Sequence, residues 1–254
     1  MRYAPGVSAP SRLPLIAGDP PELLVHDDPI TCPYLPEETA RLPLRLPIVR
    51  LSRAQLDARL ERGERRQGRL VYTTACPRCH ACEAIRIPVR DFVHSRSQRR
   101  VWRRGLAAIE TTVGEVEADP RRVWLYNRHK ALRGLESSSP ITLEGYRVLL
   151  ADSPCESFEI RYSIAGALVG IAIVDRAERG LSAVYCCYDP AHARLSLGMY
   201  SILYQIELCR SWGLDHLYLG LTIERCKAMV YKQRYFPHER LIHDEWRRFE
   251  GAGT

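Results

Sequence analysis

The chain has 254 residues, of which 46% are hydrophobic and 26% are charged, a composition typical of globular proteins. This length suits one large domain or two modest ones. No stretch approaches the roughly 18–20 consecutive apolar residues of a membrane helix, so we expect no membrane partner. The formal net charge is +7, and the segment from Arg86 to Arg104, with seven Arg and one Asp, carries +6 of it. Charge focused in this way favours a polyanionic partner such as a nucleic acid.

The cysteine content and the N-terminal segment predict a cytoplasmic protein. Three of the nine cysteines lie at two-residue intervals, which suits metal binding in a reducing compartment better than a disulfide framework. Proline and arginine interrupt residues 1–24, so the continuous apolar core of a signal peptide is missing there.

Two helices in the first half carry N-terminal capping boxes, in which a Ser is followed three residues later by Gln. The first helix is expected from Ser52 to Gly63, and the second is expected from Ser95 to about Leu106. Residues 1–50 are rich in proline and predict irregular structure. Strands are expected at 70–72 and 84–89, the second of them exposed because its apolar and polar residues alternate.

The second half predicts an antiparallel meander followed by a helix and a further strand. A helix is expected to begin at Asp119-Pro120 and to end at Gly134. The later elements are strands at 156–163, 167–175 and 181–189, a helix at 197–212, a strand at 216–219 and a short helix at 224–232. This order predicts an α+β fold with a mostly antiparallel sheet. We place the domain boundary near 105–118, between a domain of residues 1–110 and a domain of residues 111–254.

Four cysteines form a candidate metal site: Cys32, Cys76, Cys79 and Cys82. The spacing of the last three can place their sulfurs around one zinc ion or one iron–sulfur cluster, with Cys32 as the fourth ligand. His80 is an alternative ligand, and reduced thiols without a metal are the competing interpretation. The other five cysteines lie on strand or helix patterns, and we expect them to be small core residues.

The start of the second capped helix is a candidate nucleic-acid contact. Free backbone N–H groups at a helix N-terminus add to the attraction that arginine has for phosphate. His94 and Trp102 are expected to stack on an unpaired base, and a solvated basic face is the alternative. The candidate contact residues are Ser95, Arg96, Ser97, Gln98, Arg99 and Arg100.

A second candidate site lies where the last strand of the meander ends. Tyr188-Asp189-Pro190 precedes Ser196-Leu197-Gly198 at the start of a helix, and such a junction can bind a phosphate or the 3′ end of an RNA. A plain strand–loop–helix turn is equally compatible with this pattern. Lys130, Lys227 and Lys232 are the only lysines in the chain. Since almost all other basic residues are arginine, the lysines at 227 and 232 are present either by chance or because a compact site there suits lysine better than arginine.

With these motifs in their order, the chain resembles the arginyl-tRNA–protein transferase family, and specifically its bacterial leucyl-transferase branch. The resemblance extends from about residue 30 to 245. It rests on Cys32-Pro33-Tyr34-Leu35, Leu56 with Arg62-Gly63-x-Arg65-Arg66-x-Gly68, Cys76-Pro77-x-Cys79-x-x-Cys82, Arg86–Val89, Ser95–Arg100, Leu181–Tyr185, Tyr188–Pro190, Ser196–Gly198, Tyr218–Gly220 and Lys227-x-Met229-x-Tyr231-Lys232.

The resemblance implies a tRNA-dependent enzyme that transfers an amino acid, leucine in this branch, to the N-terminal Asp or Glu of a protein. In the family this transfer marks the protein for degradation by the N-degron route. The resemblance also implies a GNAT-like acyltransferase fold for the C-terminal domain, and a zinc ion or an iron–sulfur cluster at the N-terminal cysteines. We expect a monomer that uses no organic cofactor.

Three places depart from the family pattern and bear on donor or acceptor specificity. Leu221 and Thr222 stand where the family has Tyr-Trp, and Cys187 replaces an aromatic residue. Gln67 stands where Ser is typical.

The expected roles follow from an aminoacyl ester that is already activated, so that positioning matters most. Tyr188 and Tyr231 are expected to donate hydrogen bonds to the ester or to the leaving ribose, and Asp189 to bind the acceptor amine. Lys232 or Arg66 is expected to pair with the acidic side chain of the acceptor. The further tRNA- or substrate-binding candidates are Arg65, Arg66, Ser196, Gly198 and Lys227.

Other functions stay open on the sequence alone. They are arginyl transfer to acidic N-termini, tRNA-dependent aminoacylation of a small molecule or biosynthetic peptide, and a non-enzymatic RNA-binding protein stapled by a metal.

Overall fold

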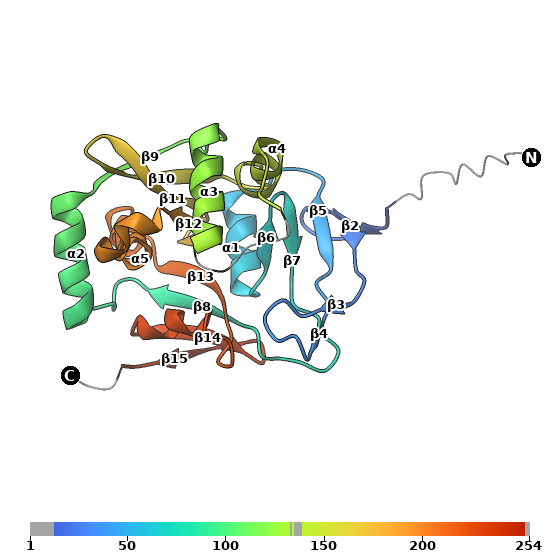
Figure 1. Cartoon of the computed structure of the whole chain (residues 1–254). Coiled ribbons are helices and arrows are strands. Elements are labelled where there is room, and N and C mark those ends of the chain that lie inside the picture. The colour runs from blue at the N-terminus through green and yellow to red at the C-terminus, as the bar shows by residue number, and fades with distance from the viewer. Residues whose placement is uncertain (1–12, 133, 135–138, 252–254) are drawn as a thin grey trace, which may run out of the picture.

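The computed structural model describes residues 13–132, 134 and 139–251. Its centre is an eight-stranded sheet in the order β15-β14-β8-β13-β12-β11-β10-β9 (Figure 1). The strands are β8 (Glu83–Pro88), β9 (Glu110–Gly114), β10 (Ser157–Ile164), β11 (Ala167–Arg176), β12 (Gly180–Tyr188), β13 (His216–Thr222), β14 (His238–Ile242) and β15 (Glu245–Phe249).

Two smaller sheets are formed by the N-terminal part of the chain. One has the order β1-β2-β5-β7-β6, and the other pairs β3 with β4. Their strands are β1 (Leu15–Ile16), β2 (Glu22–His26), β3 (Ile30–Thr31), β4 (Thr39–Ala40), β5 (Leu44–Pro47), β6 (Arg65–Gln67) and β7 (Leu70–Tyr72). The prediction of irregular structure over 1–50 is therefore wrong for the strands β1 to β5, which pair in spite of the proline content, and right for the segments between them. Residues 1–12 of that range lie outside the described residues.

The large sheet is antiparallel except where β12 and β13 run parallel. Helix α5 (Leu197–Ser211) connects these two strands, as a parallel pair requires. The predicted α+β class and the mostly antiparallel sheet are thereby confirmed, and the expected strand–helix–strand order is present.

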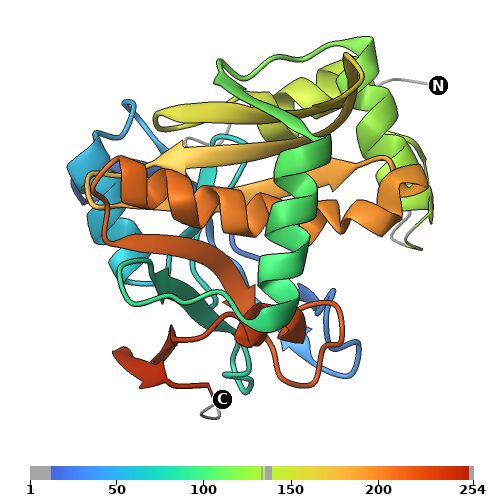
Figure 2. The same ribbon diagram turned by 90° about the vertical axis from the view of Figure 1, so that its left-hand side faces the viewer.

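Helices cover both faces of the large sheet. On one face, α5 packs on the sheet and α2 (Arg96–Ala108) crosses over α5 (Figure 2). Gly105 permits this crossing, because a Cβ there would lie 2.1 Å from the ring of Tyr200. The other face carries α1 (Arg53–Glu61), α3 (Pro120–Leu132), α4 (Leu143–Tyr146) and the π-helical turn η1 (Arg147–Ala151). None of the helices in the described ranges is long and apolar enough to cross a membrane.

Local signals predicted the starts of α1, α2 and α3 correctly, whereas the short helix expected at 224–232 is wrong, because only a 3-10 turn, η3 (Val230–Arg234), forms there. Ser52 and Ser95 cap α1 and α2 with complete capping boxes, and α3 begins at Pro120. The predicted meander is the β10–β11–β12 hairpin series.

The expectation that residues 84–89 form an exposed strand is wrong. The corresponding strand, β8, is central and almost completely buried. Its polar residue Arg86 is buried because Glu61 and Glu239 each accept a hydrogen bond of 2.6 Å from its guanidinium. The alternation of apolar and polar residues in β8 therefore reflects an ion-pair network around Arg86 and not the exposure of one face of the strand to solvent.

The division of the chain near residue 110 stays a prediction. Strand β8 precedes that boundary and pairs with β13 and β14, which follow it. Helix α2 also precedes the boundary and packs on α5.

Candidate functional site

The candidate site is a gap between β12 and β13. The two strands pair only from Gly180 opposite His216 to Ser182 opposite Tyr218. Beyond this point β12 continues beside β11, whereas β13 continues beside β8. The parallel strands therefore diverge, and their facing backbone groups become available to other parts of the chain.

Arg65 occupies this gap from strand β6. Its guanidinium donates to Ser182 Oγ at 3.2 Å and to the Ala183 carbonyl at 3.4 Å. On the β13 side, Gly220 has a φ of +83°, and a Cβ there would lie 3.2 Å from Arg65 Nη2. Burial lowers the pKa of Arg65. Within the described ranges this guanidinium forms no ion pair with a carboxylate, which is unusual for an enclosed arginine.

Lys232 lies beside Arg65. It belongs to the 3-10 turn η3 (Val230–Arg234), and its ammonium donates to the Leu221 carbonyl at 2.6 Å. Burial, followed by the charge of Arg65, lowers the pKa of Lys232 to about 7. Tyr72 and Tyr34 line the same region, and burial raises the pKa of both phenols, that of Tyr34 to about 12. The structure thus brings two predicted residues, Arg65 and Lys232, into one enclosed cationic site.

Arg66, the neighbour of Arg65, is held elsewhere. Its side chain forms a buried two-pronged ion pair with Asp175, at 2.7 and 2.8 Å, and it also donates to the Gly68 carbonyl. With these bonds its guanidinium is committed to the fold, so the geometry favours a structural role for Arg66 over the predicted substrate contact.

The four predicted metal ligands come together. Cys32, Cys76, Cys79 and Cys82 pack in one cluster, and Cys226 from the second half of the chain joins them. Burial, together with the neighbouring thiols, raises the pKa of Cys82 to about 12. Within the described ranges, however, no group of three or more Cys, His, Asp or Glu side chains is placed to hold one metal ion. His80 is exposed.

The prediction that the remaining cysteines are core residues is confirmed for four of the five. Cys155, Cys186, Cys187 and Cys209 belong to the apolar clusters around the large sheet. For Cys226 the expected strand or helix position is wrong, because it lies in the loop after β13, half-buried against the apolar cluster that holds the other four cysteines. The isolated position of Cys226 in the sequence carries no signal of this approach.

The arginine-rich start of α2 separates into capping residues and exposed residues. Ser95 and Gln98 bond to each other's backbone N–H groups, at 3.3 and 2.8 Å, and are therefore used by the helix cap. The stacking surface expected at Trp102 is already covered, since its ring stacks on Tyr200 at 5.5 Å. Ser97 is exposed, and so are five arginines that form no ion pair within the described ranges: Arg96, Arg99, Arg100, Arg103 and Arg104.

At the end of β12, Tyr188 and Asp189 have different surroundings. The ring of Tyr188 lies against Gly198 at the start of α5. Asp189 begins the 3-10 turn η2 (Pro190–Leu195), accepting bonds from the Ala191 N–H at 3.0 Å and from Arg128 at 2.7 Å. Burial opposes ionisation of Asp189, but these bonds outweigh it and lower its pKa. Asp189 thus anchors a turn, and Ser196, which has a φ of +55°, joins that turn to α5.

The last two predicted residues, Lys227 and Tyr231, are exposed on the segment that joins β13 to β14. The side chain of Lys232, on the same segment, points instead toward the Leu221 carbonyl beside Arg65.

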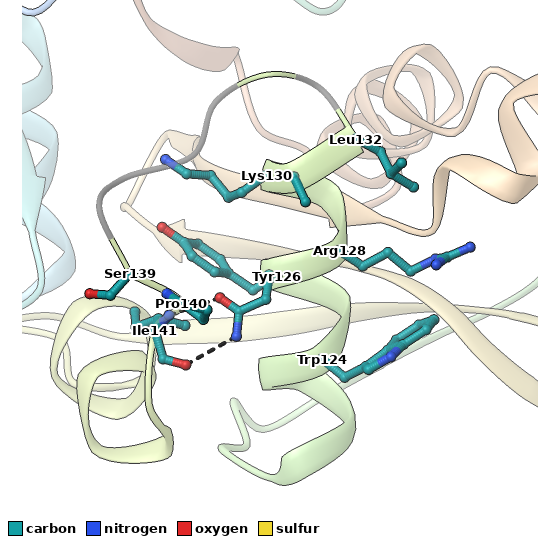
Figure 3. A pocket seen from close by; sticks show the side chains of 10 residues that line it. Trp124, Tyr126, Arg128, Lys130, Leu132, Ser139, Pro140 and Ile141 are labelled. Atoms are coloured by element: carbon teal, nitrogen blue, oxygen red, sulfur yellow. Dashed lines mark hydrogen bonds between the residues drawn. The ribbon is translucent and has the colours of Figure 1, made fainter.

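Sequence reasoning missed a pocket of about 520 Å³ on α3 (Figure 3). Its lining combines aromatic residues, Trp124 and Tyr126, with the cationic residues Arg128 and Lys130. The motif of alternating basic and aromatic residues in Arg121–Lys130 is the signal that could have indicated it.

Comparison with known proteins shows the family of this chain. The arginine-tRNA–protein transferase family is matched by its N-terminal model over residues 30–100 and by its C-terminal model over 121–242. The aspartate/glutamate leucyltransferase of Methylobacillus flagellatus is 36% identical over 222 residues, covering 85% of this chain and 88% of that protein. That of Chromohalobacter salexigens is 38% identical over 224 residues, covering 87% and 90%.

Among solved structures, L-PGS from Bacillus licheniformis matches with a TM-score of 0.43 and 12% identity, covering 66% of this chain and 50% of that one. FemX matches with a TM-score of 0.42 and 8% identity, covering 65% and 59%. The family assignment rests on the sequence matches, which extend over most of the chain. The chain belongs to the arginine-tRNA–protein transferase family.

Proposed function

We propose that this chain transfers leucine from aminoacyl-tRNA to the N-terminal Asp or Glu of an acceptor protein. The relatives named aspartate/glutamate leucyltransferase, matched over most of their length, support leucine as the donor and acidic residues as acceptors. The observation that carries the proposal is the pair of enclosed cations, Arg65 and Lys232, in the gap between β12 and β13.

Arg65 and Lys232 suit the acidic side chain of the acceptor. Within the described ranges they bond to a hydroxyl and to carbonyl oxygens but to no carboxylate. Enclosing a cation without a counter-ion is costly, so an incoming carboxylate that pairs with both groups is strongly favoured. A neutral N-terminal side chain would leave both cations unpaired, which gives the site its selectivity.

The chemistry requires little more than alignment. The acceptor amine attacks the ester carbonyl, an amide bond forms, the bond to the ribose oxygen breaks, and the proton lost by the amine ends on that oxygen. An α-amine has a pKa of about 7.7–8.0, so a sizeable fraction is neutral at cellular pH. Fixing the carboxylate of the acceptor orients its amine, and orientation is the main source of rate for an activated ester.

Tyr188 is the proposed hydrogen-bond donor to the leaving ribose. Its ring lies beside Gly198 at the N-terminus of α5, where free N–H groups attract the negative charge of the adjacent nucleotide. Ser196 and Gly198 keep their proposed role there. Asp189 and Arg66 take structural roles instead, because their bonds to Arg128 and Asp175 occupy them. Lys227 remains a proposed contact of the tRNA on the exposed segment after β13, and Tyr231 remains a proposed hydrogen-bond donor to the ester or to the leaving ribose.

The arginines of α2 are the proposed contact for the tRNA backbone. Five exposed guanidiniums lie on this one helix and form no ion pair within the described ranges. Each of them can therefore replace a counter-ion of the phosphates. Ser97 and the free N–H groups at the helix start add hydrogen bonds to the same oxygens.

We also propose that Cys32, Cys76, Cys79 and Cys82 hold a zinc ion or an iron–sulfur cluster, with a structural role. Their convergence from two segments supports this assignment. Elemental analysis of the purified chain gives the test: about one zinc, or iron with equivalent sulfide, is expected for each chain. Protein that contains neither metal and is still folded and active would refute the assignment.

A monomeric state and a cytoplasmic location also stay predictions, and sedimentation checks the monomeric state.

The transfer reaction itself can be tested with purified components. Leucyl-tRNA and arginyl-tRNA, each with a labelled amino acid, are incubated with the chain and with peptides that start with Asp, Glu or Arg. Labelled leucine is expected on the Asp and Glu peptides alone. Transfer of arginine instead would assign the other donor, and no transfer to any peptide would reject the proposed function.

Lys232→Met gives the matched test of the carboxylate site, because Met keeps much of the side-chain volume without the charge. A rise in KM for the Asp peptide is expected, with the KM for leucyl-tRNA unchanged. Equal KM values for the Asp peptide in the two proteins would remove Lys232 from the site.

A further inference from the structure

Helix α3 presents an exposed tryptophan between two arginines. Trp124 is 41% exposed. The Cζ atoms of Arg121 and Arg128 lie 4.3 and 5.1 Å from the centre of its ring. Figure 3 shows Trp124 and Arg128 projecting from the same side of α3. Both guanidiniums lie over the indole ring and are anchored there, so the surface offered to a ligand is a pair of planar cations supported by Trp124.

Both arginines are anchored at one end of the large sheet. Arg121 donates to the Leu168 carbonyl, near the start of β11, at 3.1 Å. Arg128 donates to Asp189, which directly follows β12. The group of Arg121, Trp124 and Arg128 therefore lies at the end of the sheet toward which β12 and β13 diverge.

This group is continuous with the arginines of α2. The turn η2 contacts both α2 and α3, and Figure 2 shows η2 at the N-terminal end of α5, between those helices. Arg194 of η2 is exposed and forms no ion pair in the described part of the chain. A row of exposed cations thus leads from α2 across η2 to Trp124.

We propose that Arg121, Trp124 and Arg128 bind an unpaired nucleotide near the 3′ end of the tRNA. The inference rests on the proposed function, since it assigns a second contact to the same tRNA. The base stacks on a guanidinium plane that the indole supports, and the remaining N–H groups of the arginines bind its phosphate. A paired nucleotide would not fit, because its base is already stacked within the duplex.

The charge pattern favours RNA over the acceptor protein as the occupant. Apart from Asp189, which pairs with Arg128, the charged residues named along the row are arginines, and η2 contacts α2 as well as α3. Stacking of a base on a planar cation also gives affinity without sequence readout, which suits a single-stranded end.

The chain offers a matched control at the other end of α5. Trp212 is 40% exposed, and Arg176 lies 4.6 Å from the centre of its ring. It follows the last turn of α5, whereas η2 precedes the first turn, so the length of the helix separates it from the row. Trp124→Ala and Trp212→Ala therefore remove equivalent surface indoles near opposite ends of α5.

The test measures equilibrium binding of deacylated tRNA by fluorescence anisotropy. Two probes are used, the intact tRNA and the same tRNA trimmed of its single-stranded 3′ end. Trp124→Ala is expected to weaken binding of the intact tRNA about tenfold, a typical loss for one stacked base, and to leave binding of the trimmed tRNA unchanged. Trp124→Phe should retain most of the affinity, and Trp212→Ala all of it.

Three results would overturn the inference. They are unchanged binding of intact tRNA by Trp124→Ala, an equal loss for both probes, and a raised KM for the acceptor peptide with unchanged tRNA affinity. The last result would make the surface an acceptor-protein contact. Because these probes carry no amino acid, the assay gives an answer even if wild-type chain transfers none.

Discussion

Two groups of arginines in this molecule have opposite environments. Around α1 and β6, Arg59 and Arg66 are buried and bond to Glu22 and Asp175, with donor–acceptor distances of 2.6 and 2.7 Å. The five arginines of α2 are exposed and form no ion pair within the described ranges. In the sequence both groups appear as basic runs beside a capped helix.

The position of the carboxylates determines whether an arginine supports the fold or stays available for a ligand. Glu22 and Asp175 come from strands far away in the sequence, β2 and β11. They remove Arg59 and Arg66 from the surface and make them part of the fold. Arg65 is the exception in the buried group, because it is enclosed without an acidic partner in the described ranges, and that exception marks the candidate site.

The largest effect on stability is expected for Arg66→Ala. Removing the guanidinium leaves the Asp175 carboxylate buried and unpaired, which typically costs about 3–5 kcal/mol of unfolding free energy. Urea unfolding followed by circular dichroism measures this loss. Asp175→Asn combined with Arg66→Met should recover part of it, and an unchanged midpoint in Arg66→Ala would show that the pair does not support the fold.

Arg65→Met, one residue earlier, should reduce transfer activity without reducing the free energy of unfolding. Transfer to an Asp peptide is expected to fall about 100-fold in kcat/KM, because truncating one partner of a buried charge pair costs at least about 2–3 kcal/mol. The unfolding free energy should stay equal or rise, since an enclosed cation without a partner is lost. A variant that is destabilised and still fully active would reverse the assignments of Arg65 and Arg66.

The pH dependence of the unfolding free energy tests whether Lys232 is an enclosed cation without an acidic partner. Its pKa is about 7 in the folded chain and 10.5 ordinarily, so between these values the unfolded chain binds one more proton. Stability therefore rises with pH, by about 2 kcal/mol between pH 7.5 and 9, and this contribution is lost as the pH falls to 7. In Lys232→Met that rise should be smaller by this amount, and identical pH profiles for the two proteins would contradict the lowered pKa.

The smallest effect is expected for the exposed group. Replacing Arg96 and Arg100 by Ala should weaken tRNA binding about tenfold at low salt and reduce the slope of log affinity against log salt by about two. The unfolding free energy should change little, because both side chains are exposed. An unchanged salt slope would exclude these arginines from the phosphate contact.

Signals that act within a few residues were reliable in the sequence. The capping boxes at Ser52 and Ser95 position α1 and α2, because the bonds that satisfy a helix start come from residues three apart. The meander was also predictable, since each of its strands pairs with the next along the chain. Motif order was sufficient for the family as well.

Long-range contacts were not predictable in this way. Arg86 has the alternation of an exposed strand, yet Glu61 and Glu239 bury it. Cys226 resembles a small core residue, yet it joins the cysteine cluster. In each case the decisive partner lies on a segment far along the chain, and no local pattern identifies it.

Local patterns in the chain were sufficient to predict the starts of α1, α2 and α3, the antiparallel meander, the family and the residue types of the site. Contacts between distant segments were needed to show which of two adjacent arginines faces the gap between β12 and β13 and which is neutralised by Asp175. The physical reason is that side chains alternate along β6, so neighbouring residues meet different parts of the fold. The distant carboxylates then determine where charge remains available for a substrate.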